Sequence, residues 1–543
     1  MGERNRKLSQ RELEERRRRK IARMRAERRR KRRRRALMIR AACILVIALI
    51  LGGAVWGVSS LIRRGIEKNE EKKVIQEQEQ RNRLQAATTR EQAQALAAIL
   101  AQQYDYDGAV DTLKNIDGAT RDKELTKLIA DYEMEKSNLV QVNAERIPHI
   151  YFNSLIVDKE VLFAQDSKSL AQDANRNRLT VDEFKKVLQQ LYDNGYVLVK
   201  ESDIAKVYED GTIGRGNIYL PESKKALILS INDVSYPLAY VGNGIASRLV
   251  AGSDGKLTCE YQKPDGTVET GDYDIIPILD NFIEEHPDFS YRGARGILGF
   301  TGYNGILGYR TSPELAKTGA EGNIYADYGS FNYTEEIEKV KSILKILYKE
   351  GWEFASNGYG GISYGDSIEA VKEDASKWQS NVGAILDDVV NSEYQEQDKD
   401  SSSSGSDQKT PALKNTTHIL LFPYGTDIAN WEDYSTDNEK YTFLKSLGFK
   451  YYCNVDSSQY WLQMRTEYLR QGRRSIDGYR LYQELTSDKK RLEDLFDASA
   501  VFDTSRPEGG LGSMSDLIGG QQSFGDGGQA DGGTQSGADN NDN

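Results

Sequence analysis

Histidine is scarce in this chain, which has three histidines among 543 residues. They lie far apart in the sequence, at His149, His286 and His418. Few imidazoles are therefore available as metal ligands or as catalytic bases. His418 lies on a predicted strand and is interpreted as a structural residue.

Cysteine is equally scarce, with three residues in the whole chain. Their spacing matches no cysteine-based zinc motif, which excludes that class of metal module. Cys43 lies within a long apolar run and is interpreted as a packing residue. Cys259 and Cys453 either form one disulfide outside the cell or remain buried thiols.

Charge is missing from one long apolar run. Residues 41–62, AACILVIALILGGAVWGVSSLI, contain no charged side chain. At a rise of about 1.5 Å per residue, a helix of this length spans the roughly 30 Å hydrocarbon core of a bilayer. We expect a single transmembrane helix that acts as an uncleaved signal anchor, and small residues at 57–60 leave cleavage as the alternative.

The segment before this run is basic and the rest of the chain is acidic. Residues 1–40 contain 20 Lys and Arg against 5 acidic residues, a balance of +15, so the remainder carries −25 to reach the net −10. The positive-inside rule places the basic segment in the cytoplasm and the main part of the chain outside the cell. Nucleic-acid binding is the alternative explanation of an arginine tract. Membrane topology and attraction to anionic lipid already account for it, so no nucleic-acid partner is expected.

Composition divides the rest of the sequence further. Residues 63–90 are rich in Glu, Lys, Gln and Arg and predict a juxtamembrane stalk. Residues 91–145 place apolar side chains at helical spacing and resemble a tetratricopeptide-type hairpin with a third helix, which must pack on another surface. Residues 507–543 are rich in Gly, Asp and Gln, lack Lys and Arg, and are expected to be disordered.

The main predicted domain comprises residues 146–506, where strands alternate with helices. This alternation predicts a mainly parallel sheet covered by helices. Two stretches interrupt it: a predicted hairpin insertion at 256–273 and a Ser-rich flexible loop at 391–415. The strands are predicted at 150–157, 196–199, 226–231, 295–301, 352–355, 418–422, 449–453 and 500–502, and the helices at 181–194, 273–285, 334–350, 367–390 and 438–447.

Polar residues follow two of these strands directly. The run ALILSINDVSY at 226–236 ends its apolar part at Asn232 and Asp233, and GWEFASNGYGG at 351–361 opens from a strand into a polar loop. Ligands of α/β folds are met at the carboxyl ends of such strands. Two strand ends of this kind can converge on one site.

These residues, and three further segments, resemble the polysaccharide deacetylase family, also called the NodB homology domain. The segment IPHIYFNSLI at 147–156 is similar to the family's opening strand, 179–199 to the helix and strand that follow, and LLFPYGT at 420–426 to its Arg-Pro-Pro-Tyr-Gly strand. The order and spacing of all the segments carry the resemblance. It implies an irregular seven-stranded (β/α) barrel, and a divalent metal such as zinc that activates water to remove N-acetyl groups from glycan.

The chain departs from the family at nearly every chemical position. Asn232 stands at the catalytic base, so that only Asp233 remains of the aspartate pair, and the two histidine ligand positions are Asn357 and Gly361. One carboxylate and one carboxamide make a poor zinc site, and an amide cannot accept a proton near neutral pH. No metal or other cofactor is therefore expected. The remaining departures are Asn153, Leu421 and Phe422.

Each remaining candidate has a plain structural alternative. Asp233 is either a surviving ligand or a residue that caps the strand end. The glycine-rich loop 358–365 either cradles phosphate or is the remnant of a metal loop. The aromatic residues suit stacking on sugar rings but can equally be structural: Tyr359, Tyr364, Tyr424 and Trp431. The basic cluster either binds an anionic polymer or braces loops: Arg470, Arg473 and Arg474.

Three hypotheses follow for function. The favoured one is a membrane-anchored, extracytoplasmic, deacetylase-like protein that binds cell-wall polysaccharide or an envelope protein without metal-dependent catalysis. The second is an active metal-dependent polysaccharide or peptidoglycan N-deacetylase. The third makes the helical module an envelope assembly scaffold. Fold similarity alone does not decide between them, because function depends on the site.

Overall fold

The computed structural model describes residues 90–164, 168–208, 210–314, 332–360, 362–401, 414–456, 458–488, 490–507 and 511. The predicted basic segment 1–40, transmembrane helix 41–62 and most of the stalk 63–90 lie outside the described residues, as does nearly all of the tail 507–543. Within the described ranges no helix is long and apolar enough to cross a bilayer.

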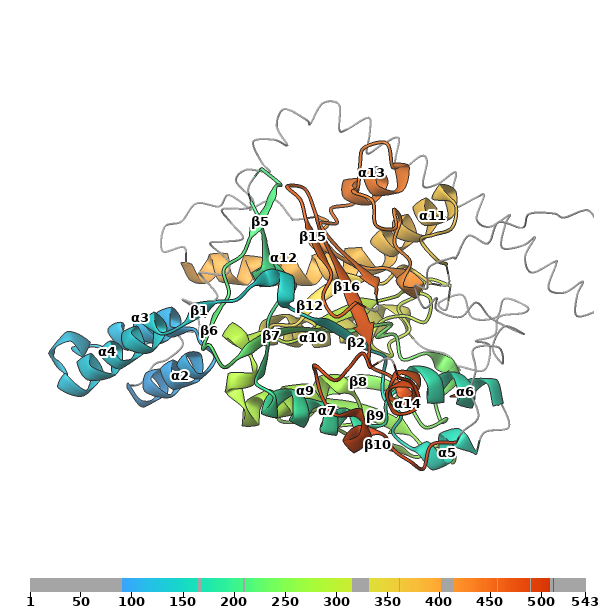
Figure 1. Ribbon diagram of the computed structural model, residues 1–543, viewed down its shortest axis with the longest axis horizontal. Helices are drawn as coiled ribbons and strands as arrows, with labels where there is room; N and C mark the ends of the chain where they lie inside the picture. The colour runs from blue at the N-terminus through green and yellow to red at the C-terminus, as the bar shows by residue number, and fades with distance from the viewer. Residues whose placement is uncertain are drawn as a thin grey trace, which may run out of the picture. The chain divides into compact units, whose positions relative to one another are not determined.

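Seven parallel strands close into a barrel (Figure 1). Around the ring each strand pairs with the next, and β11 pairs with β7 to complete the closure. The predicted seven-stranded α/β barrel is confirmed at this level. In ring order the strands are β7 (Lys225–Ile231), β11 (Ile297–Phe300), β12 (Glu353–Ser356), β13 (Ile419–Leu421), β14 (Tyr451–Val455), β16 (Leu469–Ser475) and β2 (His149–Phe152).

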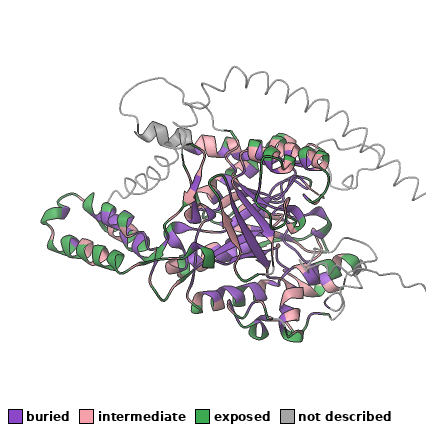
Figure 2. Cartoon of the chain, turned by 45° about the horizontal axis from the view of Figure 1, so that its top comes forward, coloured by how far each residue is buried: buried purple, intermediate pink, exposed green. Residues whose placement is uncertain are grey.

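The two faces of each barrel strand pack against different cores, because successive side chains of a strand point to opposite sides. On β7, Leu227, Leu229 and Ile231 belong to the core between the barrel and its helices, whereas Ala226 and Ile228 belong to a second core. The barrel strands are buried almost throughout (Figure 2). This is the pattern of a parallel barrel covered by helices.

Helices and short strands surround the ring. Thr180 and Glu183 form the predicted capping box of α7. The helices of the main domain are α5 (Lys159–Phe163), α6 (Lys168–Asn177), α7 (Val181–Asp193), α8 (Glu201–Ile204), α9 (Ile275–Glu285), α10 (Tyr333–Glu350), α11 (Ile368–Trp378), α12 (Ala384–Ser401), α13 (Glu439–Ser446), α14 (Gly478–Thr486) and α15 (Ala498–Val501). The further strands are β1 (Val140–Gln141), β3 (Tyr196–Leu198), β4 (Ala205–Val207), β5 (Ile213–Arg215), β6 (Tyr219–Leu220), β8 (Arg248–Ala251), β9 (Leu257–Gln262), β10 (Val268–Gly271) and β15 (Leu462–Met464).

The predicted insertion at 256–273 is a hairpin. Its strands β9 and β10 pair antiparallel, and β8 joins β9 to make a three-stranded sheet. The alternating burial of β9 explains why the pattern was visible in the sequence.

Two predicted elements are wrong. The strand predicted at 500–502 is the helix α15, whose buried Ala498 and Val501 are one turn apart and whose first turn is capped by Asp497. The loop predicted at 391–415 begins as helix, because α12 continues to Ser401. The buried Glu393, which pairs with Lys349 at 3.0 Å, holds that continuation against α10.

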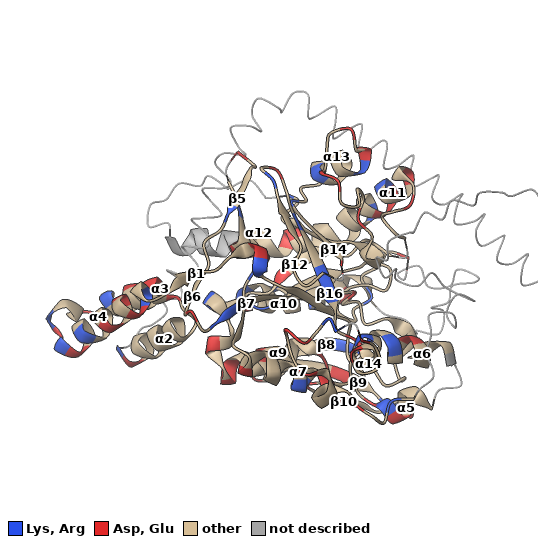
Figure 3. Ribbon diagram, in the orientation of Figure 1, with Lys and Arg blue, Asp and Glu red and all other residues tan. Residues whose placement is uncertain are grey.

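The helical module contains α2 (Arg90–Gln102), α3 (Tyr106–Lys114) and α4 (Lys123–Ser137). It packs on the main domain: Tyr104 Oη donates to the carbonyl of Asp288 at 3.0 Å, and Arg292 N donates to the carbonyl of Gln103 at 2.8 Å. Its surface carries both signs of charge (Figure 3). The turn between α2 and α3 therefore contacts the main domain, whereas the apolar faces of the three helices form a small core of their own.

A buried ion pair fastens the end of the main domain to α7. Arg506 Nε donates to Glu183 Oε1 at 2.8 Å, Arg506 Nη2 donates to Glu183 Oε2, and both side chains are almost fully buried. Removal of one partner from such a pair leaves an uncompensated buried charge, which costs about 3–5 kcal/mol.

We therefore expect Glu183→Ala to lower the free energy of unfolding by about 3–5 kcal/mol in urea denaturation followed by circular dichroism. Glu284→Ala is the matched control, because it removes an ion pair with Lys256 that is largely exposed and should cost less than about 1 kcal/mol. Equal losses in the two variants would contradict this account of Glu183.

Candidate functional site

The carboxyl ends of the barrel strands form one end of the barrel, here called the mouth. Asp233 follows β7 and Asn357 follows β12, and the structure brings them together: Asp233 N donates to Asn357 Oδ1 at 3.1 Å. Gly299 on β11 leaves room for this contact, since a Cβ there would lie 3.2 Å from the Cβ of Asn357. The two polar strand ends of the sequence thus meet at one place.

Hydroxyl groups surround the carboxylate of Asp233. Its Oδ1 accepts from Ser235 Oγ at 2.6 Å and from Thr301 Oγ1 at 2.5 Å, and its Oδ2 accepts from Tyr303 Oη at 3.1 Å. Burial, with the Asp233 charge as the second cause, raises the pKa of Tyr303, so this hydroxyl keeps its proton. The backbone of Asp233 has φ +47°, in the left-handed region that non-glycine residues seldom adopt.

Neutral side-chain amides that bond backbone groups occupy two of the other predicted positions. Asn357 Nδ2 donates to the carbonyl of Leu421 at 2.9 Å, so both ends of this carboxamide are engaged. Asn153 Nδ2 donates to the carbonyl of Asn177 at 2.8 Å. Gly361 lies outside the described residues. Among the described residues, no group of three potential metal ligands includes Asp233.

Arg473 is a residue of the mouth that the sequence did not identify as such. It is fully buried on β16, where its guanidinium lies over the ring of Tyr151, 4.9 Å from the centroid. Arg473 Nη1 donates to Asn232 Oδ1 at 2.7 Å, and the described residues offer its Nε and Nη2 no partner. Burial lowers the pKa of Arg473. Asn232 thus serves as the acceptor for a buried cation.

The neighbouring arginines brace loops. Arg470 is buried and pairs with Asp427 at 3.0 Å, and Arg474 pairs with Asp494 at 2.8 Å. Figure 3 shows this basic strand β16 within the barrel. The run LRQGRRS has no alternation of apolar and polar residues, and its charges argue against burial, so the sequence carried no signal for this strand.

The glycine-rich loop has no free amides for phosphate at its start. Tyr359 N and Gly360 N donate to the two carboxylate oxygens of Asp374, at 2.8 and 3.1 Å. A carboxylate from α11 therefore occupies the place where a bound anion would be held.

The predicted sugar-stacking residues separate into two groups. Tyr359 is buried and donates through its hydroxyl to Glu314 at 2.7 Å, and Tyr364 is fully buried, so both are structural. Tyr424 and Trp431 are 44% and 59% exposed. Both follow β13 in the chain.

Two more aromatic side chains extend this exposed group. Tyr303, which the sequence analysis missed, is 36% exposed beside Asp233. Trp461 stands edge-on to Trp431 with ring centroids 5.3 Å apart. We call Tyr303, Tyr424, Trp431 and Trp461 the aromatic rim. Indole and phenol faces of this kind suit carbohydrate rings.

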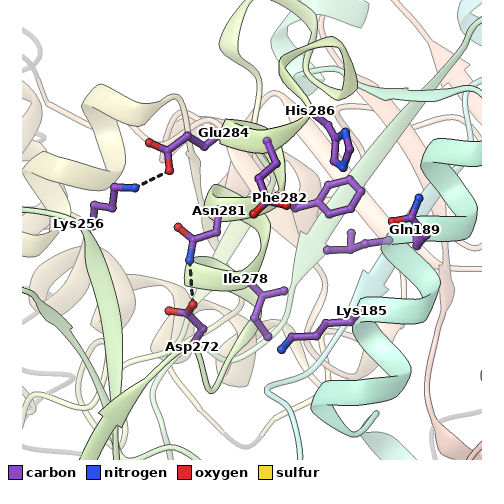
Figure 4. Close-up of a pocket in the computed structure, with 11 residues that line it drawn as sticks. Lys185, Gln189, Lys256, Asp272, Ile278, Asn281, Phe282, Glu284 and His286 are labelled. Atoms are coloured by element: carbon purple, nitrogen blue, oxygen red, sulfur yellow. Dashed lines mark hydrogen bonds and ion pairs between the residues drawn. The ribbon is translucent and has the colours of Figure 1, made fainter.

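The remaining sequence candidates are structural. His418 Nδ1 lies 2.8 Å from the carbonyl of Gly448, and Cys259 and Cys453 are separate buried thiols without a disulfide. A hollow of about 570 Å³ lies on the outer layer between α7 and α9 (Figure 4). Among the residues that line this hollow, Asn281 Nδ2 donates to Asp272 Oδ2. No residue of the mouth lines the hollow.

Comparisons with known proteins add no identification: no family model, no curated protein and no solved structure matches this chain.

The contact with Arg473 predicts that replacement of Asn232 costs more stability than replacement of Asn153. Asn232→Leu removes the close acceptor of a buried guanidinium and should lower the free energy of unfolding by about 3 kcal/mol. Asn232→Asp supplies a counter-charge instead and should leave the protein at least as stable as the wild type.

Urea denaturation measures both, with Asn153→Leu as the control. Asn153 donates only to a backbone carbonyl, so its replacement should cost about 1 kcal/mol. If Asn232→Leu and Asn153→Leu lose the same stability, Arg473 does not depend on Asn232.

Proposed function

We propose that this protein is a polysaccharide deacetylase-like barrel that binds cell-envelope glycan and has no metal-dependent catalysis at its mouth. One observation carries the proposal: the oxygens of Asp233 accept from hydroxyl groups, and the carboxamide of Asn357 is fully engaged. A catalytic zinc needs about three protein ligands and an open position. Among the described residues, no group of three potential metal ligands includes Asp233.

The same arrangement argues against base catalysis. A general base must accept a proton, and an amide at position 232 cannot do so near neutral pH. In addition, Asn232 Oδ1 already accepts from Arg473. Asp233 is the remaining carboxylate, and its lone pairs are directed at three hydroxyl donors.

The aromatic rim supports binding as the surviving activity. Trp431 and Tyr424 expose their rings on the segment that follows β13, and Tyr303 adds a phenol beside Asp233. Arg470 holds part of this segment in place, because Nη1 donates to the carbonyl of Glu432 at 2.5 Å and Nη2 donates to the carbonyl of Asn430. A rigid, exposed aromatic surface loses little conformational entropy when it binds a sugar.

The proposed location is the outer face of the cell membrane. It rests on the apolar run 41–62 and on the basic residues that precede it. With this topology the barrel faces the cell-wall polysaccharide, and an envelope protein is the alternative partner. Anionic lipid is the partner we propose for the basic N-terminal segment.

Titration of the full chain in detergent micelles with chitooligosaccharide and with soluble peptidoglycan fragments tests the proposal. We expect binding in excess EDTA, under conditions in which the far-ultraviolet circular dichroism spectrum shows that the fold is retained. Trp431→Ala should weaken binding about two- to tenfold, since one stacked ring contributes roughly 0.5–1.5 kcal/mol. Tyr219→Ala, which removes a 41% exposed tyrosine on β6, is the control and should bind like the wild type.

Release of acetate would contradict the proposed binding function. Release of acetate from either glycan, dependent on added zinc and abolished by Asp233→Ala, would establish the enzyme instead of the binding protein. Absence of binding to both glycans, with the fold intact, would refute the glycan partner.

A further inference from the structure

A second polar cluster lies inside the barrel, apart from the mouth. His149 is the first residue of β2, Glu201 is the first residue of α8, and Cys453 lies in the middle of β14. All three are buried, and one ligand atom from each lies within 4.8 Å of the other two. We call these three residues the lumen cluster. They come from distant parts of the sequence, so no spacing motif could have revealed them.

The separations in the lumen cluster are those of a set of metal ligands. His149 Nδ1 lies 3.8 Å from Glu201 Oε2, and Cys453 Sγ lies 4.0 Å from Glu201 Oε1. Ligands at about 2.0–2.3 Å from a tetrahedral zinc are roughly 3.3–3.7 Å apart. The His149–Glu201 and Cys453–Glu201 pairs meet different oxygens of Glu201, and each would shorten by a few tenths of an ångström around an ion. All three ligand atoms lie within 4.8 Å of one another.

A fourth donor lies beside His149. Gln471 Oε1 is 3.0 Å from His149 Nδ1, and its orientation is fixed because Gln471 Nε2 donates to the carbonyl of Ile147 at 3.1 Å. An imidazole, a thiolate, a carboxylate and, once its hydrogen bond to His149 Nδ1 is given up, the carboxamide oxygen of Gln471 would supply four ligands. A site with four protein ligands and no open position is the arrangement of structural zinc.

Glu201 supplies an independent sign that something is bound. Its Oε2 is buried, and no described residue offers it a hydrogen bond. The surroundings are largely apolar, with Val199, Ile204 and Leu421 in the same core. An unpartnered buried carboxylate oxygen is costly, and a cation held between Oε2 and His149 Nδ1 would remove that cost.

The second layer of contacts suits metal binding by His149. Coordination through Nδ1 requires the proton on Nε2, and Ser230 Oγ lies 2.9 Å from Nε2 as an acceptor. Ser230 Oγ is itself within 3.5 Å of the carbonyl of Ile150, to which it can donate. Metal-bound histidines are usually oriented by a contact of this kind. Burial lowers the pKa of His149, which keeps the imidazole neutral as a ligand must be.

A second carboxylate lies next to the cluster. Glu353 is half-buried and accepts from Glu201 N at 2.7 Å and from Ser202 Oγ at 2.7 Å. A carboxylate so close to Glu201 favours a cation at the cluster.

We propose that His149, Glu201 and Cys453, with the side-chain oxygen of Gln471, bind one zinc ion that ties β2, α8, β14 and β16 together at the centre of the barrel. The thiolate and imidazole ligands favour zinc over magnesium or calcium, which take oxygen ligands. The site is structural and separate from the mouth. It does not depend on the proposed glycan binding.

Metal analysis and cobalt spectroscopy of the full chain test the proposal. The chain is purified in detergent without a metal-affinity step from zinc-supplemented cells. We expect about one zinc per chain by mass spectrometry, and less than about a tenth of that in Cys453→Ser and Glu201→Gln. Cys259→Ser is the matched control, because Cys259 is also buried but its near contact is Tyr236; it should retain the metal.

Cobalt identifies the ligands directly. A cobalt-substituted wild-type chain should show thiolate-to-cobalt charge transfer in the near ultraviolet, absent from Cys453→Ser and unchanged in Cys259→Ser and Asp233→Ala. If the Cys453 or Glu201 variant does not fold, the thiolate band of the wild type, retained in Cys259→Ser, still supports the site. A wild-type chain without stoichiometric metal and without this band overturns the proposal. Loss of the metal in Asp233→Ala would instead place it at the mouth.

Discussion

The chemistry of this protein is constrained by a guanidinium that lies inside a closed barrel and forms no ion pair with a described carboxylate. Arg473 is fully buried, and its closest acceptor is the side-chain oxygen of Asn232. A buried cation without an ion-paired carboxylate must be solvated by oriented dipoles, and an amide oxygen supplies one. Asn232 is thereby committed to a structural contact with this cation.

Closure of the ring explains why such contacts accumulate in one place. Seven strands point alternate side chains into a narrow interior, so polar residues from distant segments must satisfy one another there. Ser230 shows the effect, because its hydroxyl lies within hydrogen-bond distance of both His149 and Arg473. The lumen cluster and the mouth are thus connected by side chains on β7, yet their compositions differ. The mouth presents amides and hydroxyls, and the interior holds the thiol, the imidazole and the buried carboxylates.

The sequence predicted the barrel where a strand is apolar on both faces, and failed where it is not. β7 is a continuous apolar run that ends at Asn232, so both the strand and the polar end were visible. β16 was missed because arginine is rarely buried. Inside the fold, Arg470 lies over the ring of Tyr434, Arg473 donates to the side-chain amide of Asn232, and Arg474 pairs with Asp494. The segment 500–502 was mistaken for a strand because three residues cannot separate helical from extended periodicity.

One part of the candidate sites could be predicted from the sequence and the other could not. Asp233 and Asn357 could be predicted to meet, because both follow strands whose ends lie at one edge of a parallel sheet. The lumen cluster could not, since its members are separated by 52 and 252 residues along the chain and only the closure of the ring brings them together. Scarcity of histidine argued against any metal. Scarcity limits the number of sites, however, and a single imidazole with a thiolate and a carboxylate is already a sufficient set.

In the proposed function, a mouth without metal chemistry and a surface that binds glycan are physically compatible because they depend on different supports. The predicted motif positions lie at the ends of β7 and β12, where the side chain of Asn357 bonds the backbone of Asp233 and of Leu421. The aromatic rim depends on Arg470, which pairs with Asp427 and holds the carbonyls of the loop that carries Trp431. None of these contacts involves Asn232, Asp233 or Asn357. A change of residue at the predicted motif positions is therefore expected to leave the aromatic rim in place, so that the chemistry of the mouth and its affinity for a polymer can vary independently.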